Sequence, residues 1–139
     1  MNKEKKEQYK LTNEQYLMAV RQEEGVAELS NGVLYKVIES GDPKKQKNKV
    51  KNESIVTVRY KGSLANGVVF DDVFDQDYPE TFRVYELIAG FQIALLSMHV
   101  GDLWRVYIPA EMGYGSRNAG TIPANSTLIF DIKLIAVAG

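Results

Sequence analysis

The sequence predicts an α+β domain in which one antiparallel sheet packs against one short helix. Apolar and polar residues alternate in the segments 54–64, 103–109 and 127–135, a pattern typical of strands with one buried face. The segment GFQIALLSM at 90–98 is too dense in apolar residues for such a strand, and a helix of about two turns fits it better. The apolar faces of the sheet and the helix are expected to bury each other.

Length and composition support a single globular domain and exclude several kinds of chemistry. A chain of 139 residues that is 45% hydrophobic can build a core without metals or disulfides. A net charge of -1 does not favour nucleic acid or an anionic membrane as a partner. The absence of cysteine and the single histidine, His99, argue against a thiol nucleophile, a metal site or a hydrolytic triad. We therefore expect no metal and no cofactor.

The sequence as given indicates a cytoplasmic protein. No apolar run approaches the roughly 18 to 20 residues that cross a bilayer, so membrane insertion is not expected. The charged residues of MNKEKKEQYK are not followed by the apolar segment of an export signal. If such a signal was removed, the expected compartment is the periplasm.

The first 25 residues are expected to form a polar tail and a short helix, ahead of the folded domain at 26–139. Residues 1–10 are charged and polar, which favours a frayed tail. Thr12 and Gln15 have the spacing of a capping box, and Gly25 is a stop signal, so the helix is placed at about 13–24. The face formed by Tyr16, Leu17 and Val20 is its apolar side.

Three further signals order the middle of the chain. A short strand is expected at 34–38, ended by Gly41-Asp42-Pro43. The five lysines between 44 and 51 indicate a solvated loop, since no aromatic residues are interleaved for nucleic-acid stacking. Asn66-Gly67 predicts a tight turn between the strand at 54–64 and the strand that contains VVFDD.

The helix at 90–98 has apolar residues on two sides. One stripe contains Phe91, Ala94, Leu95 and Met98 and should face the sheet. Ile93 and Leu96 point roughly opposite and would be exposed to water unless something covers them. The N-terminal helix is one candidate cover, and a second copy of the protein is the other.

Aromatic and aliphatic residues at the ends of strands and loops are the candidate site. Each of them could equally be an ordinary core residue. The glycine loop GYGSRNAG is not expected to bind phosphate, because it leads into a strand rather than a helix N-terminus. The candidates are Tyr60, Phe70, Leu87, Ile88, Phe91, Tyr114, Ile122 and Phe130.

The order of these residues resembles that of a known family. VTVRYKGSLANGVVFDD, ELIAGFQIALLSMHVGDLWRVYIPAEMGYG and GTIPANSTLIFDIKL are similar to the FKBP-type peptidyl-prolyl cis-trans isomerases, over residues 33–137. EEGVAELSNGVLYKVIESGD is similar to the lead-in of the bacterial macrophage-infectivity-potentiator-like branch. In that branch a longer N-terminal helical part usually makes a dimer, and only a stub of it is present here, so a monomer or weak dimer is expected.

The resemblance implies a curved sheet of five or six antiparallel strands wrapped around the short helix, with an apolar cleft between them. The cleft residues that it implies are Tyr60, Asp71, Phe91, Tyr114 and Phe130 for catalysis and Phe70, Leu87, Ile88 and Ile122 for substrate binding. The Tyr114 hydroxyl and the Ile88 N–H would face the ligand. The chain departs from the family at four places, with Phe91 for the usual tryptophan, Gln76 for a frequent arginine, Glu80 for an apolar residue and Ala124 for a proline.

The implied activity is peptidyl-prolyl cis-trans isomerisation in peptides and unfolded proteins. Rotation about an X-Pro bond has a barrier of roughly 18 to 20 kcal/mol, and an apolar cleft lowers it by removing water from the imide and by fitting its twisted shape. Macrolides such as tacrolimus and rapamycin are further ligands that the family implies. The alternative is a binding module or holding chaperone that uses the same cleft with little turnover.

Overall fold

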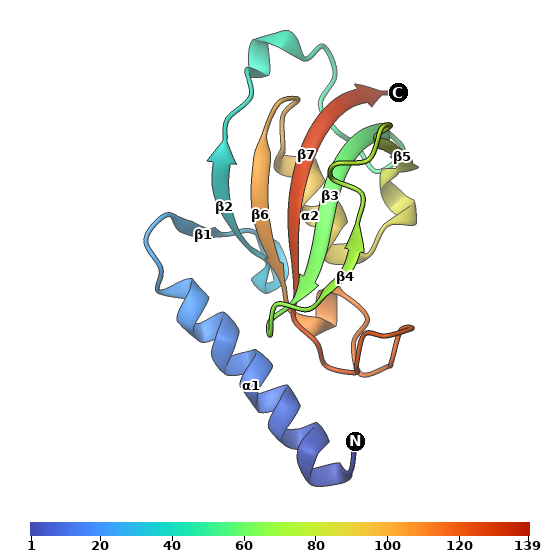
Figure 1. Ribbon diagram of the computed structural model, residues 1–139. Coiled ribbons are helices and arrows are strands. Elements are labelled where there is room, and N and C mark those ends of the chain that lie inside the picture. Colours follow the sequence, from blue (N-terminus) through green and yellow to red (C-terminus); the bar gives the residue numbers. More distant parts are fainter.

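The computed structural model describes residues 1–139 and contains a seven-stranded antiparallel sheet with two α-helices (Figure 1). The strands follow the order β1-β2-β6-β7-β3-β4, and β5 pairs with β3. The predicted α+β class is confirmed, with seven strands in place of five or six. The elements are α1 (Lys3–Arg21), β1 (Val26–Glu28), β2 (Leu34–Glu39), β3 (Ile55–Leu64), β4 (Val69–Asp72), β5 (Glu80–Arg83), α2 (Ala89–Ser97), β6 (Leu103–Ile108) and β7 (Leu128–Ala138).

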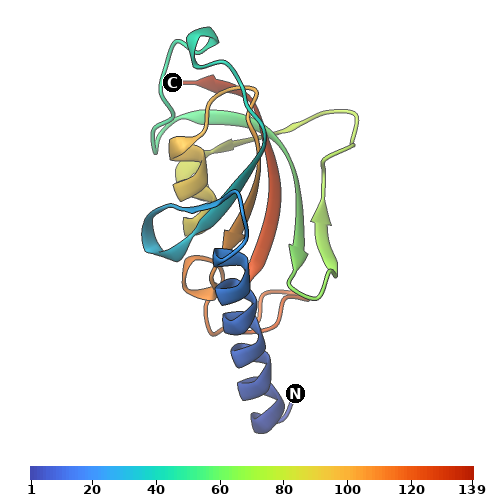
Figure 2. The ribbon, with the colours of Figure 1, turned by 90° about the vertical axis from the view of Figure 1, so that its left-hand side faces the viewer.

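The sheet curves around α2, which lies on its concave side (Figure 2). The alternation read from the sequence gives the buried face of each long strand, because successive side chains point to opposite sides of a sheet. The fully buried side chains of this face and of α2 form one core: Val56, Val58, Val106, Ile108, Leu128, Ile132, Leu134, Ala94 and Leu95.

The close approach of α2 to the sheet depends on Gly90. A Cβ atom at this position would lie 2.4 Å from Cγ2 of Ile108 on β6. Since carbon atoms normally touch at about 3.5–4.0 Å, any larger residue would push the helix away from the sheet. Gly90 thus fixes the depth at which the neighbouring Phe91 enters the core.

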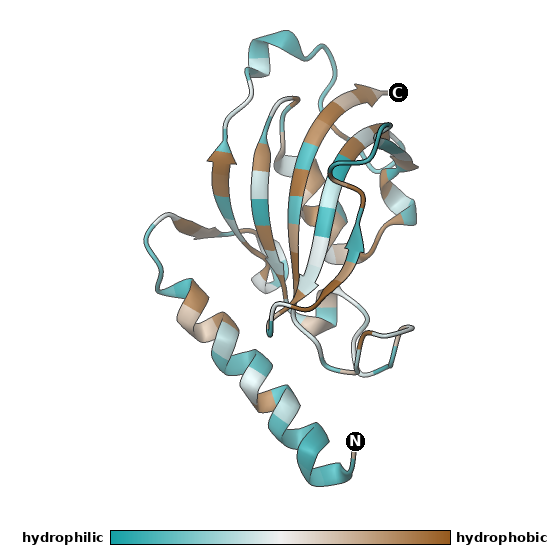
Figure 3. Ribbon diagram, viewed as in Figure 1, coloured by the Kyte–Doolittle hydropathy of each residue, from teal (hydrophilic) through white to brown (hydrophobic).

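The N-terminal helix is longer than predicted. α1 begins at Lys3, so the expected frayed tail at 1–10 is wrong. Asn2 caps the helix by accepting a hydrogen bond from the Lys5 N–H at 2.9 Å, and the following lysines and glutamates are good helix formers. Figure 3 shows how polar these first turns are. Neither α1 nor α2 combines the length and the apolar character that a bilayer-spanning helix requires.

The apolar side of α1 packs against the outer face of the sheet. Tyr16, Leu17 and Val20 contact a small cluster that contains Leu34 and Tyr107. The predicted apolar side of this helix is therefore confirmed, whereas its predicted role as a cover for α2 is wrong. Ile93 and Leu96 are half-buried against the main core instead. The alternative cover, a second copy of the protein, stays a prediction.

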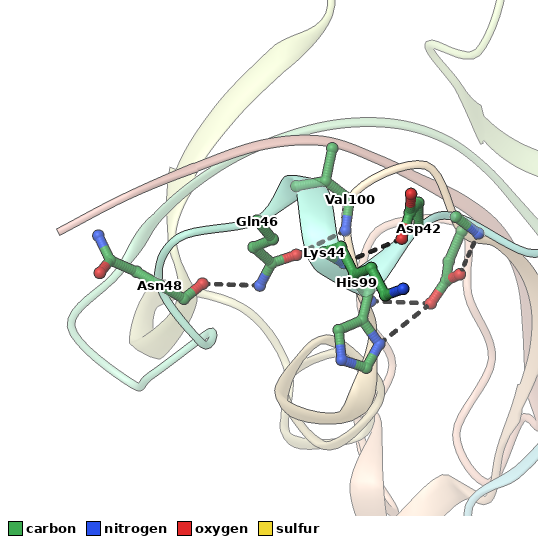
Figure 4. A network of polar contacts seen from close by, with 8 residues as sticks. Asp42, Lys44, Gln46, Asn48, His99 and Val100 are labelled. Carbon is green, nitrogen blue, oxygen red and sulfur yellow. Dashed lines mark hydrogen bonds and ion pairs between the residues drawn. The ribbon is translucent and has the colours of Figure 1, made fainter.

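A polar network fixes the lysine-rich loop to the turn after α2 (Figure 4). Asp102 is buried, and its two carboxylate oxygens accept hydrogen bonds from the Gly41 N–H at 2.6 Å and the His99 N–H at 2.8 Å. Gln46 accepts a hydrogen bond from the Val100 N–H at 2.7 Å. The loop is mostly exposed, as predicted, and it is held by Asp102 just before its first lysine and by Gln46 within it.

Candidate functional site

Four aromatic rings from four different elements meet between the sheet and α2. We call this group, Tyr60 on β3, Phe70 on β4, Phe91 on α2 and Phe130 on β7, the aromatic cluster. The ring centroids of Phe91 and Phe130 are 5.2 Å apart, and the Phe91 ring meets Tyr60 edge to face at 5.7 Å. Phe70 meets Phe130 edge to face at 5.6 Å. These distances and angles are those of favourable aromatic pairs.

The position of the rings depends on Gly62. This residue pairs with Phe130 across β3 and β7 and with Asp71 across β3 and β4. A Cβ atom at Gly62 would lie 2.7 Å from Cε1 of Phe130 and 2.7 Å from Cζ of Phe70. Two rings therefore lie over the bare backbone of β3, which is why a glycine follows Tyr60 by two residues. The role of Gly62 depends on rings from β4 and β7, which the local pattern VTVRYKGSL does not contain.

Asp71 and Tyr60 form a hydrogen-bonded pair at the edge of the cluster. The Tyr60 hydroxyl donates to Oδ2 of Asp71 at 2.8 Å, and both residues are half-buried. Burial raises the pKa of Tyr60, and the hydrogen bond to Asp71 raises it further. The phenol is thus kept protonated, and its proton is directed toward the carboxylate rather than toward the centre of the cluster.

Leu87 and Ile88 lie half-buried against the core, where the chain enters α2. The Gln92 side chain donates to the Leu87 carbonyl at 2.6 Å, which fixes the backbone just before the helix. The Ile88 carbonyl accepts from the Gln92 N–H at 3.1 Å, whereas the Ile88 N–H has no backbone partner. This N–H is a free donor three residues before Phe91.

Tyr114 and Ile122 lie on the loop between β6 and β7. Ile122 is buried in the main core, whereas the Tyr114 ring is 42% exposed. Tyr114 makes a minor electrostatic contribution to the raised pKa of Tyr60, so the two tyrosines lie near each other. The loop is closed by a hydrogen bond from the Asn125 N–H to the Gly115 carbonyl at 2.8 Å and by a bridge between Ala119 and Ile122.

Two features near the cluster were missed by sequence reasoning. The ring of Phe82, on β5, lies 6.2 Å from that of Tyr60. The only signal for it was an aromatic residue at the third position of a strand too short to show alternation. Arg59 donates to the carbonyls of Phe74 at 3.1 Å and Gln76 at 2.6 Å. It thereby orders the segment between β4 and β5 that contains Gln76.

The main surface cavities lie elsewhere than among the rings of the aromatic cluster. The rings of the aromatic cluster line none of the five main cavities. One of about 440 Å³ lies between the start of α1 and the loop at 116–125, with Ile122 in its wall. An open apolar cleft lined by all nine predicted residues therefore stays a prediction.

The arrangement offers an apolar surface with donors at its border. Phe91 and Phe130 are buried, the rings of Tyr60 and Phe70 are half-buried, Tyr114 is exposed, and the Ile88 N–H has no backbone partner. Such a surface can hold an apolar ring and orient a nearby carbonyl group. Asp71, the nearest carboxylate, is already occupied by Tyr60.

Comparison with known proteins identifies the family. Residues 46–135 match the FKBP-type peptidyl-prolyl cis-trans isomerase family. The chain is 40% identical over 123 residues to peptidyl-prolyl cis-trans isomerase Mip of Coxiella burnetii, which covers 88% of this chain and 52% of that protein. It is 38% identical over 134 residues to outer membrane protein MIP of Legionella longbeachae, which covers 96% of this chain and 56% of that protein.

Solved structures give the same result. A peptidyl-prolyl cis-trans isomerase from Pseudomonas syringae pv. tomato has a TM-score of 0.86 and 32% identity, with 96% of each chain covered. FkpA from Escherichia coli has a TM-score of 0.87 and 31% identity, over 96% of this chain and 61% of that one. The chain spans about half the length of the curated relatives that it matches. It belongs to the FKBP-type peptidyl-prolyl cis-trans isomerase family.

Proposed function

We propose that this chain is a peptidyl-prolyl cis-trans isomerase that acts on proline-containing peptides and unfolded proteins. The observation that supports this most is the aromatic cluster around Phe91, with unpaired donors at Ile88 and Tyr114 on its border. The family membership and the names of the relatives in Coxiella and Pseudomonas agree with it.

The reaction needs no bond cleavage, so the demands on the site are modest. The barrier of roughly 18 to 20 kcal/mol arises because twisting the imide destroys amide resonance. Resonance places charge on the carbonyl oxygen, and water solvates that planar form better than the twisted form. An apolar surface that excludes water therefore favours the twisted form. A ten-thousandfold acceleration requires about 5.5 kcal/mol of such preference.

The proposed roles follow the position of each residue. Phe91 and Phe130 receive the prolyl ring, and Phe70 with Leu87 and Ile122 borders it. The Tyr114 hydroxyl and the Ile88 N–H donate to carbonyl oxygens of the peptide and so hold its backbone while the imide twists. Tyr60 and Asp71 act as a pair, in which the hydrogen bond of 2.8 Å keeps the Tyr60 ring against Phe91.

A peptide isomerisation assay tests this proposal. Removing the Tyr114 hydroxyl is expected to lower kcat/KM about tenfold, the worth of one good hydrogen bond of about 1.4 kcal/mol. Tyr35→Phe is the matched control, because that ring stacks on Trp104 with centroids 4.2 Å apart, outside the aromatic cluster. If Tyr114→Phe and Tyr35→Phe both retain the wild-type rate, Tyr114 has no part in turnover.

A holding chaperone is the second candidate, and the exposed apolar residues favour it. Tyr78 is 80% exposed and Tyr85 is 57% exposed, on either side of β5. Such rings could bind unfolded segments without turning them over. Refolding of a proline-limited protein separates the two candidates, because catalysis works at trace amounts whereas holding requires equivalent amounts.

Three further points are proposals of the same kind. Tacrolimus and rapamycin are proposed to occupy the surface around Phe91, and competition with a peptide substrate would measure this. The periplasm is the proposed compartment, since the Legionella relative is named an outer membrane protein, and cell fractionation tests it. A monomer or weak dimer is the proposed state, to be measured by sedimentation.

A further inference from the structure

α1 is attached to the loop that carries Tyr114, one turn before its apolar contacts with the sheet. Asn13 on α1 is only 4% exposed. Its side-chain oxygen accepts a hydrogen bond from the Thr127 N–H at 2.8 Å, and its carbonyl accepts from the Thr127 hydroxyl at 3.4 Å. Its amide nitrogen donates to the carbonyl of Tyr9 at 2.8 Å. A buried asparagine thus joins α1 to the residue before β7.

Tyr9 extends this attachment by one residue into the loop. The oxygens of Tyr9 and Ser126 are 2.6 Å apart, and Ser126 also donates to the Pro123 carbonyl at 2.7 Å. Since a serine hydroxyl has one proton, the Tyr9 hydroxyl is the donor to Ser126. The result is a directed series of hydrogen bonds from α1 to Pro123, the residue after Ile122.

The same attachment leads to Tyr114 by a short route. Asn125, which precedes Ser126, donates its N–H to the carbonyl of Gly115 at 2.8 Å, and Gly115 follows Tyr114. Asn125 has a positive φ of 64°, a left-handed conformation that asparagine adopts more readily than most other residues. The hydrogen bonds from α1 therefore fix the end of the loop that leads into β7. The hydrogen bond from Asn125 closes this end onto Gly115. Figure 2 shows α1 running past this end of the sheet.

We propose that Tyr9 and Asn13 are positioning residues: α1 sets the position of Tyr114 and Ile122 through Ser126 and Thr127, and thereby tunes peptide turnover. This rests on the proposed isomerase function. The competing explanation is that these hydrogen bonds only stabilise the fold, in which case their loss lowers stability and leaves the loop where it is.

Tyr9→Phe is the decisive variant, because it removes one hydroxyl and keeps the ring. Asn13→Ala leaves the buried Thr127 N–H without an acceptor and risks unfolding, so Asn13→Asp, which keeps an acceptor, serves as its conservative partner. Met18→Ala is the control on the same helix, since Met18 is 67% exposed. In NMR spectra, Tyr9→Phe is expected to shift the amide signals of Gly115 and Tyr114, and Met18→Ala is expected to leave them unchanged.

A double-mutant cycle then connects the loop to turnover. Tyr9→Phe is expected to lower kcat/KM about threefold in the wild-type background and to have no effect when Tyr114 is already phenylalanine, because coupled residues give non-additive effects. Equal losses in both backgrounds, no loss at all, or amide shifts confined to Ser126 and Thr127 would overturn the proposal. If the wild-type chain has no isomerase activity, the proposed function fails, and the amide shifts alone decide whether α1 positions the loop.

Discussion

Gly62→Ala is the most informative substitution for the proposed site. The added Cβ would lie 2.7 Å from Cε1 of Phe130, 2.7 Å from Cζ of Phe70 and 2.8 Å from Cε1 of Phe70. Normal carbon contacts are about 3.5–4.0 Å, so two rings must each move by about 0.8–1.3 Å. Phe130 cannot retreat freely, because its centroid is already 5.2 Å from that of Phe91.

Overpacking of this kind costs about 1–3 kcal/mol in protein cores. For a chain of this size that corresponds to a fall in Tm of about 3–12 °C. Because Phe130 and Phe70 move toward the surface that receives the prolyl ring in our proposal, kcat/KM should fall as well. We expect about a tenfold loss, equivalent to about 1.4 kcal/mol of transition-state binding.

The assays are thermal unfolding and peptide isomerisation, each with two comparisons. Gly67→Ala is the control for backbone effects, since Gly67 has a φ of +89° and its added Cβ would meet nothing within 4 Å. It should cost about 1 kcal/mol of stability without changing the rate. Phe70→Leu removes one of the two rings in contact, so the penalty of Gly62→Ala should fall by about half in that background. An equal penalty in both backgrounds, or an unchanged Tm, would refute the packing argument.

Three other predictions concern stability. Burial raises the pKa of Tyr60, so its contribution is complete below the unfolded value of about 10 and is lost as pH rises from there through the folded pKa; Tyr60→Phe should therefore flatten the loss of stability in urea titrations between about pH 10 and 12, and an unchanged slope contradicts this. Gly90→Ala should destabilise by about 1–3 kcal/mol through contact with Ile108, although alanine is the better helix former; a gain in the urea midpoint would show the reasoning to be wrong. Asp102→Asn should cost about 1–3 kcal/mol by turning an NH₂ group toward the N–H of Gly41 or His99; a Tm equal to that of the wild type would count against this role.

The parts of the fold that were predicted correctly depend on local pattern. Alternation along 54–64, 103–109 and 127–135 identified β3, β6 and β7 because the side-chain period of a strand is two. The apolar density of 90–98 identified α2, because it is too high for a strand with one buried face. The rings at Tyr60, Phe91 and Phe130 come together because each lies on one of these elements.

The parts that were missed depend on contacts distant in sequence or on short elements. The helical start of α1 was missed because polarity was taken as a sign of disorder, whereas Asn2 caps this helix and Asn13 fixes it to Thr127, 114 positions away. β1 and β5 have three and four residues and show no period. The role of Gly62 requires the positions of two rings from other strands, which no local pattern contains.

The central claim is that the surface around Phe91 turns over X-Pro bonds rather than only binding them. The most direct test is NMR exchange spectroscopy of a short proline peptide with a trace of this protein. The account predicts faster cis-trans exchange at an unchanged cis:trans ratio, since a catalyst accelerates both directions equally, and a smaller acceleration with Tyr114→Phe. An exchange rate that equals that of the free peptide, with peptide signals broadened only at equivalent protein, would contradict it.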